Sequence, residues 1–139
     1  MDLRPARWIV AAVAAMVLVQ AESALASDQW TPSEWVAEDT LELGTTAPGE
    51  DLYWFKVWLV VIDGDVYVRL GGTASGRFEE STTRPYLGVR IAGKEFARVE
   101  GVPEPDKAEQ VGKLMAEKYW TDIFVRWMDH PLTLRLRPE

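Results

Sequence analysis

The chain has 139 residues, no cysteine, a single histidine and a formal net charge of −7. The lack of cysteine excludes a disulfide framework, a thiolate metal site and a cysteine nucleophile, and one histidine cannot build a multi-histidine metal site within one chain. The acidic balance provides no attraction to phosphate backbones, so we expect no nucleic-acid partner.

The first residues have the pattern of an export signal. Two arginines precede an unbroken apolar run over residues 9–19, and Ala24-Leu25-Ala26 supplies the small-x-small pattern that signal peptidase cleaves. The run is short for a bilayer span and no charged stop-transfer flank follows it, which favours a cleaved signal over an uncleaved membrane anchor. The sequence therefore predicts a signal peptide over residues 1–26 and one exported domain, periplasmic or secreted, over residues 27–139.

The predicted domain begins with a short helical turn and a first strand. Thr31 followed by Pro32 is typical of a helix start, and we expect the flanking Trp30 and Trp35 to lie against the sheet or barrel edge. Residues 40–43 indicate a strand, and the next segment, with its Pro-Gly pair, indicates a loop.

The strongest signal is a hairpin over residues 54–70. Its first arm, residues 54–62, is apolar on both faces, which is typical of a strand covered on either side. Asp63-Gly64 tolerates the positive φ angles of a short hairpin turn. The second arm alternates between two faces, with Val66, Val68 and Leu70 on one and Tyr67 and Arg69 on the other.

The segment after the hairpin, residues 71–77, is small, polar and basic, and we expect it to be a loop. One helical turn fits residues 78–83 before Pro85. Two further strands, residues 86–92 and 95–99, are expected to form a hairpin around a Gly93-Lys94 turn.

A late helix is predicted over residues 107–120. Asp106 and Glu109 have the spacing of a capping box, and an apolar stripe follows at helical spacing. Residues 121–128 fit either strand or helix, and the alternation over residues 132–137 indicates a last strand. These elements predict a mainly β (α+β) fold, a small split β-barrel of about six mostly antiparallel strands with one packed late helix, because antiparallel sheets of this size curl shut to remove their edges.

The glycine-rich segment carries the best candidate binding chemistry. Its glycines let backbone amides approach an anion, Thr73 and Ser75 add hydroxyls, and Arg77 can hold a phosphate through two hydrogen bonds. Glu79 and Glu80 follow closely and oppose such a ligand by like charge. The alternative is a solvated loop between strands.

The order of these segments resembles the pyridoxamine-phosphate-oxidase-like split β-barrel family, which includes flavin- and deazaflavin-binding relatives. The resemblance rests on the hairpin 57–68, the Ser75-Gly76-Arg77 segment, the hairpin around Gly93, the late helix and the closing strand. It implies that FMN or a deazaflavin is held through its phosphate by Ser75 and Arg77, supported by Thr73 and Arg69. It also implies a homodimer with the cofactor at the interface, and hydride transfer as the reaction.

Other residues leave alternatives open. Trp54 and Trp58 share one face of their strand and are candidates to wall a pocket for a planar ring, with core packing as the alternative. His130 is a candidate haem ligand, but it precedes Pro131 in a predicted loop, so haem is the less favoured cofactor. The alternative functions are a non-enzymatic exported binding module for an apolar, aromatic, haem or sugar ligand, and a cofactor-free member of the family.

Overall fold

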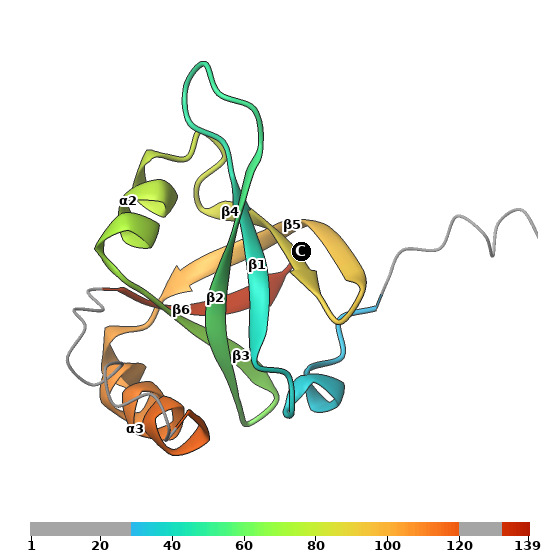
Figure 1. Cartoon of the computed structure of the whole chain (residues 1–139), viewed down its shortest axis with the longest axis vertical. Coiled ribbons are helices and arrows are strands. Elements are labelled where there is room, and N and C mark those ends of the chain that lie inside the picture. Colours follow the sequence, from blue (N-terminus) through green and yellow to red (C-terminus); the bar gives the residue numbers. More distant parts are fainter. Residues whose placement is uncertain (1–28, 120–131) are drawn as a thin grey trace, which may run out of the picture.

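The computed structural model describes residues 29–119 and 132–139, and these form one closed six-stranded antiparallel barrel (Figure 1). The strands follow each other around the barrel in the order β1-β2-β3-β6-β5-β4, and β4 pairs back onto β1. This arrangement confirms the predicted fold class. The strands are β1 (Thr40–Thr45), β2 (Tyr53–Ile62), β3 (Asp65–Leu70), β4 (Tyr86–Ile91), β5 (Lys94–Pro103) and β6 (Leu132–Pro138).

Several sequence-based predictions lie outside the described residues. They are the signal peptide over residues 1–26, His130 and the ambiguous segment 121–128.

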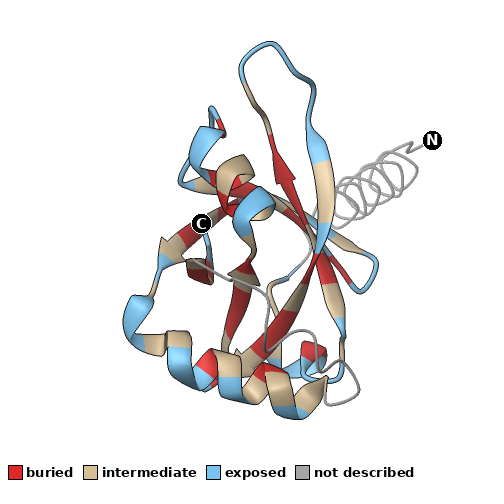
Figure 2. Cartoon of the chain, turned by 60° about the vertical axis from the view of Figure 1, so that its left-hand side comes forward, coloured by how far each residue is buried: buried red, intermediate tan, exposed pale blue. Residues whose placement is uncertain are grey.

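The inward-facing residues of all six strands fill the interior of the barrel. The buried stretches of the strands are red in Figure 2. The alternation predicted for the second hairpin arm is confirmed, because Val66, Val68 and Leu70 are fully buried. The 3-10 turn η1 (Pro32–Trp35) closes one end, where the Trp35 ring, 1% exposed, packs edge-on against Trp30 at 4.9 Å between ring centroids. Both tryptophans therefore lie against the barrel, as predicted.

The two-residue turns follow from backbone geometry. Asp63 and Gly64 have φ angles of 52° and 82°, which confirms the predicted turn of the first hairpin. In the second hairpin the turn residues are Ala92 and Gly93, at φ 50° and 77°, so the predicted Gly93-Lys94 position was wrong by one residue. Glycine is favoured at the second position of such a turn, and Lys94 is already the first residue of β5.

The prediction of a loop over residues 71–77 was wrong, because the helix α2 (Gly72–Glu80) includes most of that segment. Its glycines and hydroxyl residues disfavour a helix by local propensity. Tertiary burial decides otherwise: Phe78 is buried in the barrel core, and Ala74, one helical turn earlier, packs against the same cluster.

The late helix α3 (Ala108–Lys118) covers the outer face of β2 and β3. Val111 and Met115 of the predicted apolar stripe are buried there against Val60 and Ile62, so β2 is covered on both sides, as predicted. The predicted capping box was wrong, because a 3-10 turn, η2 (Pro105–Lys107), occupies the start of this segment and α3 begins without a side-chain cap.

Candidate functional site

A small pocket lies beside the start of α2, at the outer face of β2 and β3. Both α2 and α3 lie on this side of the barrel (Figure 1). Its volume is about 230 Å³. It is lined by residues of β2, by the ends of β1 and β3, and by the first turn of α2: Thr40, Lys56, Val57, Trp58, Arg69, Gly71 and Ala74.

The strand register explains why three side chains meet there. On β2 the odd-numbered residues from Phe55 onward pack toward the barrel core, which places Lys56 and Trp58 on the outer face. The pairing of β2 with β3 runs as far as Leu59 opposite Val68. Trp58 and Arg69 follow at the next step of the same register, so their side chains are neighbours on the outer face.

Arg69 is the most unusual residue of this pocket. Its Nε atom is buried and has no hydrogen-bond partner among the described residues. No ion pair joins Arg69 to any carboxylate in the described parts of the chain, and burial lowers the pKa of its guanidinium. The hydroxyl of Thr133, opposite Arg69 on β6, is also buried without a partner there. A half-buried cation that has no counter-charge among residues 29–119 and 132–139 is unfavourable within that part of the fold, and a bound anion would relieve it.

The Trp58 ring is fixed in position by the end of α3. It stacks on Tyr119 with 5.1 Å between ring centroids and 20° between ring planes. The Tyr119 hydroxyl shares its single hydrogen between the backbone oxygens of Leu59, at 3.0 Å, and Asp39. Burial raises the pKa of Tyr119 to about 12. This side of the pocket is therefore a rigid aromatic wall.

The first turn of α2 forms the opposite part of the pocket wall. Gly71 is the N-cap, and the first hydrogen bond of the helix runs from the Ser75 N–H to the Gly71 oxygen at 2.8 Å. The N–H groups of Gly72, Thr73 and Ala74 come before that bond and have no acceptor within the helix. The positive end of the helix dipole therefore lies at the same pocket as Arg69 and Lys56.

The structure separates the five residues proposed from sequence. Arg69 and Trp58 line the pocket, and Thr73 lies in the helical turn beside it. Ser75 is buried, and its hydroxyl donates to the Leu70 oxygen at 3.1 Å. Arg77 lies on another part of the surface: its guanidinium stacks over Tyr53, 4.1 Å from the ring centroid, and pairs with Glu50 at 3.2 Å. The division arises because the segment is a helix, in which neighbouring residues point in different directions.

Lys56 was not among the predicted site residues. The signal that identifies it is the alternation of β2, since Lys56 and Trp58 are two residues apart and share a face. It is not the only charge on this face, because Glu42 of β1 lies opposite it in register. Glu79 and Glu80, expected beside the phosphate, lie at the other end of α2, about 10 Å along the helix from its start.

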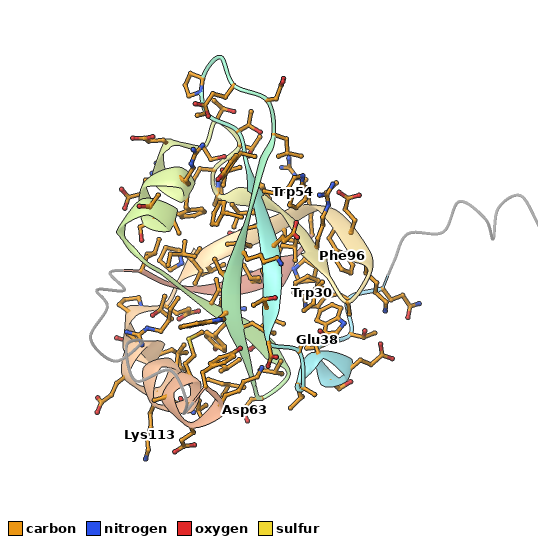
Figure 3. The ribbon with its side chains drawn as sticks, in the orientation of Figure 1. Trp30, Glu38, Trp54, Asp63, Phe96 and Lys113 are labelled. Atoms are coloured by element: carbon orange, nitrogen blue, oxygen red, sulfur yellow. The ribbon has the colours of Figure 1, made fainter. Side chains whose placement is uncertain are left out.

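The second tryptophan of β2 lies in a different environment. Trp54 shares the outer face with Trp58 but lies across Gly44 and Gly88, with the Arg90 guanidinium 3.9 Å from its ring centroid (Figure 3). It lines a separate cavity of about 600 Å³ together with Tyr86. The two tryptophans therefore do not wall a common pocket.

Comparisons with known proteins identify the fold alone. No family model and no curated protein matches the chain. One similar solved structure, a domain-swapped dimer, is 11% identical with a TM-score of 0.54, and the match covers 95% of this chain and 98% of that one. A second is 22% identical with a TM-score of 0.52, covering 78% of this chain and 77% of the other.

None of the helices in residues 29–119 is long and apolar enough to cross a membrane. The described residues also contain no group of three histidine, aspartate or glutamate side chains placed to hold a metal ion.

Proposed function

We propose that the pocket between α2 and the outer face of β2 and β3 binds the phosphate of a flavin-type nucleotide, FMN or a deazaflavin. The observation that carries this proposal is the Arg69 guanidinium, which has no counter-charge among the described residues and lies at a pocket with Lys56 and the start of α2. An arginine fork can hold two phosphate oxygens, and the free N–H groups of a helix start favour an anion.

The size of the pocket indicates how much of the ligand one chain holds. Its volume of about 230 Å³ is below the roughly 300–1,000 Å³ of typical small-molecule pockets. In this proposal the pocket takes the phosphate and its attached carbons, and the ring system extends past Trp58. The rest of the site is completed by a second copy of the chain, as the family resemblance implies. The similar domain-swapped dimer supports the proposal that chains of this fold pair.

The chain's contribution to a reaction would be binding and orientation. A bound flavin supplies the redox chemistry itself, and hydride transfer is the reaction class that the family resemblance implies. Arg69 and Lys56 would fix the phosphate, and the Trp58–Tyr119 pair would limit where the ring can lie. In this proposal the domain is exported before it binds its cofactor.

The test compares FMN with riboflavin, which has the same ring and no phosphate. We expect the protein to quench the fluorescence of FMN in a saturable way, and to bind riboflavin at least tenfold more weakly. Arg69→Ala should weaken FMN binding about 10- to 100-fold, because hydrogen bonds to charged groups contribute about 1.5–3 kcal/mol. Arg77→Ala is the matched control and should bind FMN as the natural chain does, because Arg77 pairs with Glu50 away from the pocket. Equal affinities for the two flavins, or no binding of either, would refute the proposal.

Dimerisation is tested separately by sedimentation equilibrium of residues 27–139 with and without FMN. We expect a dimer that tightens when FMN is present. A monomer at all concentrations with FMN bound at full stoichiometry would show that one chain holds the whole ligand.

A second candidate function is favoured by the larger cavity beside Trp54. Its lining of Leu52, Trp54 and Tyr86 is mostly apolar, which suits a non-enzymatic binding module for an apolar or aromatic ligand. Guanidinium groups stack on both rings, Arg90 on Trp54 and Arg98 on Tyr86, so the ring faces are less available to a ligand. Binding of a hydrophobic dye that is lost in Leu52→Glu, and is unaffected by Arg69→Ala, would support this alternative.

A further inference from the structure

The helix α3 contains a glycine at a position where helices rarely favour one. Gly112 lies in the interior of the 11-residue helix, directly after the buried Val111. Glycine is the least favourable residue in a helix interior apart from proline. Its presence calls for a reason in the surrounding packing.

The reason is the guanidinium of Arg69. A Cβ atom built on Gly112 would lie 2.8 Å from Nη1 of Arg69, 3.3 Å from Cζ and 3.8 Å from Nη2. A carbon atom cannot come as close as 2.8 Å to this nitrogen, so any side chain at this position must displace the guanidinium. The other two glycines in the described helices differ, because Cβ atoms on Gly72 and Gly76 would meet nothing within 4 Å.

We propose that Gly112 is a positioning residue for anion binding: the missing side chain leaves the space in which the Arg69 guanidinium lies against α3 at the edge of the pocket. This inference rests on the proposed function. The guanidinium lies beside three elements: its own strand β3, β6, where Thr133 is the register partner of Arg69, and α3 at Gly112. A cation fixed before the ligand arrives binds with a smaller loss of conformational freedom.

A side chain at position 112 should affect the affinity for FMN more than the stability of the fold. In Gly112→Ala the guanidinium moves, because it is the end of a flexible side chain while the helix backbone is held by Val111 and Met115. Moving the guanidinium out of hydrogen-bonding range removes part or all of the interaction that Arg69→Ala removes, which is about 10- to 100-fold in affinity. Alanine favours the helix at the same time, so the variant remains folded.

The experiment is a double-mutant cycle with a matched helix control. The variants are Gly112→Ala, Arg69→Ala, their double mutant and Gly76→Ala. For each, FMN and riboflavin affinities are measured by flavin fluorescence up to millimolar ligand, and the thermal midpoint is measured without ligand.

We expect Gly112→Ala to weaken FMN binding about tenfold or more while Gly76→Ala stays within about twofold of the natural chain. In the Arg69→Ala background, Gly112→Ala should have no further effect on FMN affinity, since the group it displaces is absent. There it should raise the thermal midpoint by a few degrees, as Gly76→Ala does, because only the helix preference remains.

Two results would overturn the inference while leaving the proposed function intact. One is FMN binding by Gly112→Ala with natural affinity, and the other is an equal loss of affinity in the presence and absence of Arg69. If the natural chain does not bind FMN, the proposed function is refuted, and the positioning role of Gly112 is refuted with it. The thermal midpoints then show whether the contact between Gly112 and Arg69 is packing alone.

Discussion

Replacing Arg69 by methionine should make the protein more stable without a ligand and unable to gain stability from one. Methionine keeps an unbranched apolar stem of similar length and removes the guanidinium. The buried Nε has no hydrogen-bond partner among the described residues, and a donor in that state destabilises a protein by about 1–3 kcal/mol. Because Arg69 is only half-buried, the lower end applies, and we expect the free energy of unfolding to rise by about 1 kcal/mol.

Bound FMN should reverse which of the two chains, natural or Arg69→Met, is the more stable. A site saturated with FMN at about 100 times Kd stabilises the folded chain by about 2.7 kcal/mol. The natural chain should gain this amount, and Arg69→Met should gain almost none. The natural chain is then the less stable of the two without FMN and the more stable with it.

Urea denaturation followed by circular dichroism measures both values, in buffer free of phosphate and sulfate and then with FMN. The control is Arg77→Met, which removes an exposed ion pair with Glu50 and a stack on Tyr53. Its free energy of unfolding should be lower than that of the natural chain by up to about 1 kcal/mol, and by the same amount with and without FMN. If Arg69→Met unfolds more easily than the natural chain by over about 1 kcal/mol without a ligand, the arginine is already compensated within the fold, and the argument for a missing anion is refuted.

Three further predictions concern the barrel and its helix. Gly88→Ala places a Cβ 2.7 Å from the Trp54 ring, so it should lower the free energy of unfolding in urea by about 1–3 kcal/mol. The control Gly76→Ala should raise it by up to about 1 kcal/mol. Equal effects of the two substitutions would contradict the close contact. Trp35→Ala removes a ring that is 1% exposed and should destabilise the chain by about 3–5 kcal/mol in the same assay, and a loss below about 1 kcal/mol would mean that the ring does not close the barrel. Because the pKa of Tyr119 is raised to about 12, from an ordinary value near 10, the folded state binds more protons than the unfolded state in this range, and stability should be lost as the pH rises from about 10 to 12. Thermal midpoints of Tyr119→Phe should fall less over that interval, and parallel curves would show that the hydroxyl is not buried as described.

Much of the fold could be predicted from the sequence, because its signals are local. The alternation of Val66, Val68 and Leu70 describes a strand with one buried face, and the structure buries all three. Asp63-Gly64 predicts a tight turn, because few residues adopt positive φ at low cost. A chain with several such hairpins must remove its strand edges, so a closed barrel follows from the pattern.

The sequence could predict the candidate site only in part. Arg69 and Trp58 were identified, but Ser75 and Arg77 were assigned to the same loop as Thr73, and the structure places that segment in a helix. Local propensity opposes this helix, and the burial of Phe78 against the barrel outweighs it. Propensity is a matter of tenths of a kcal/mol for each residue, whereas burial of one large side chain contributes about 1.5–3 kcal/mol.

The sequence alone indicated the strands, the turns to within one residue and the amphipathic face of α3, because each depends on neighbours in the chain. Only the tertiary structure decided which charges meet. Lys56, Arg69 and the start of α2 come from separate elements, and Gly112 is brought against Arg69 from 43 positions further along the chain. Side chains that distant are joined by the register of the barrel and by the packing of α3 on it, neither of which is contained in any local pattern.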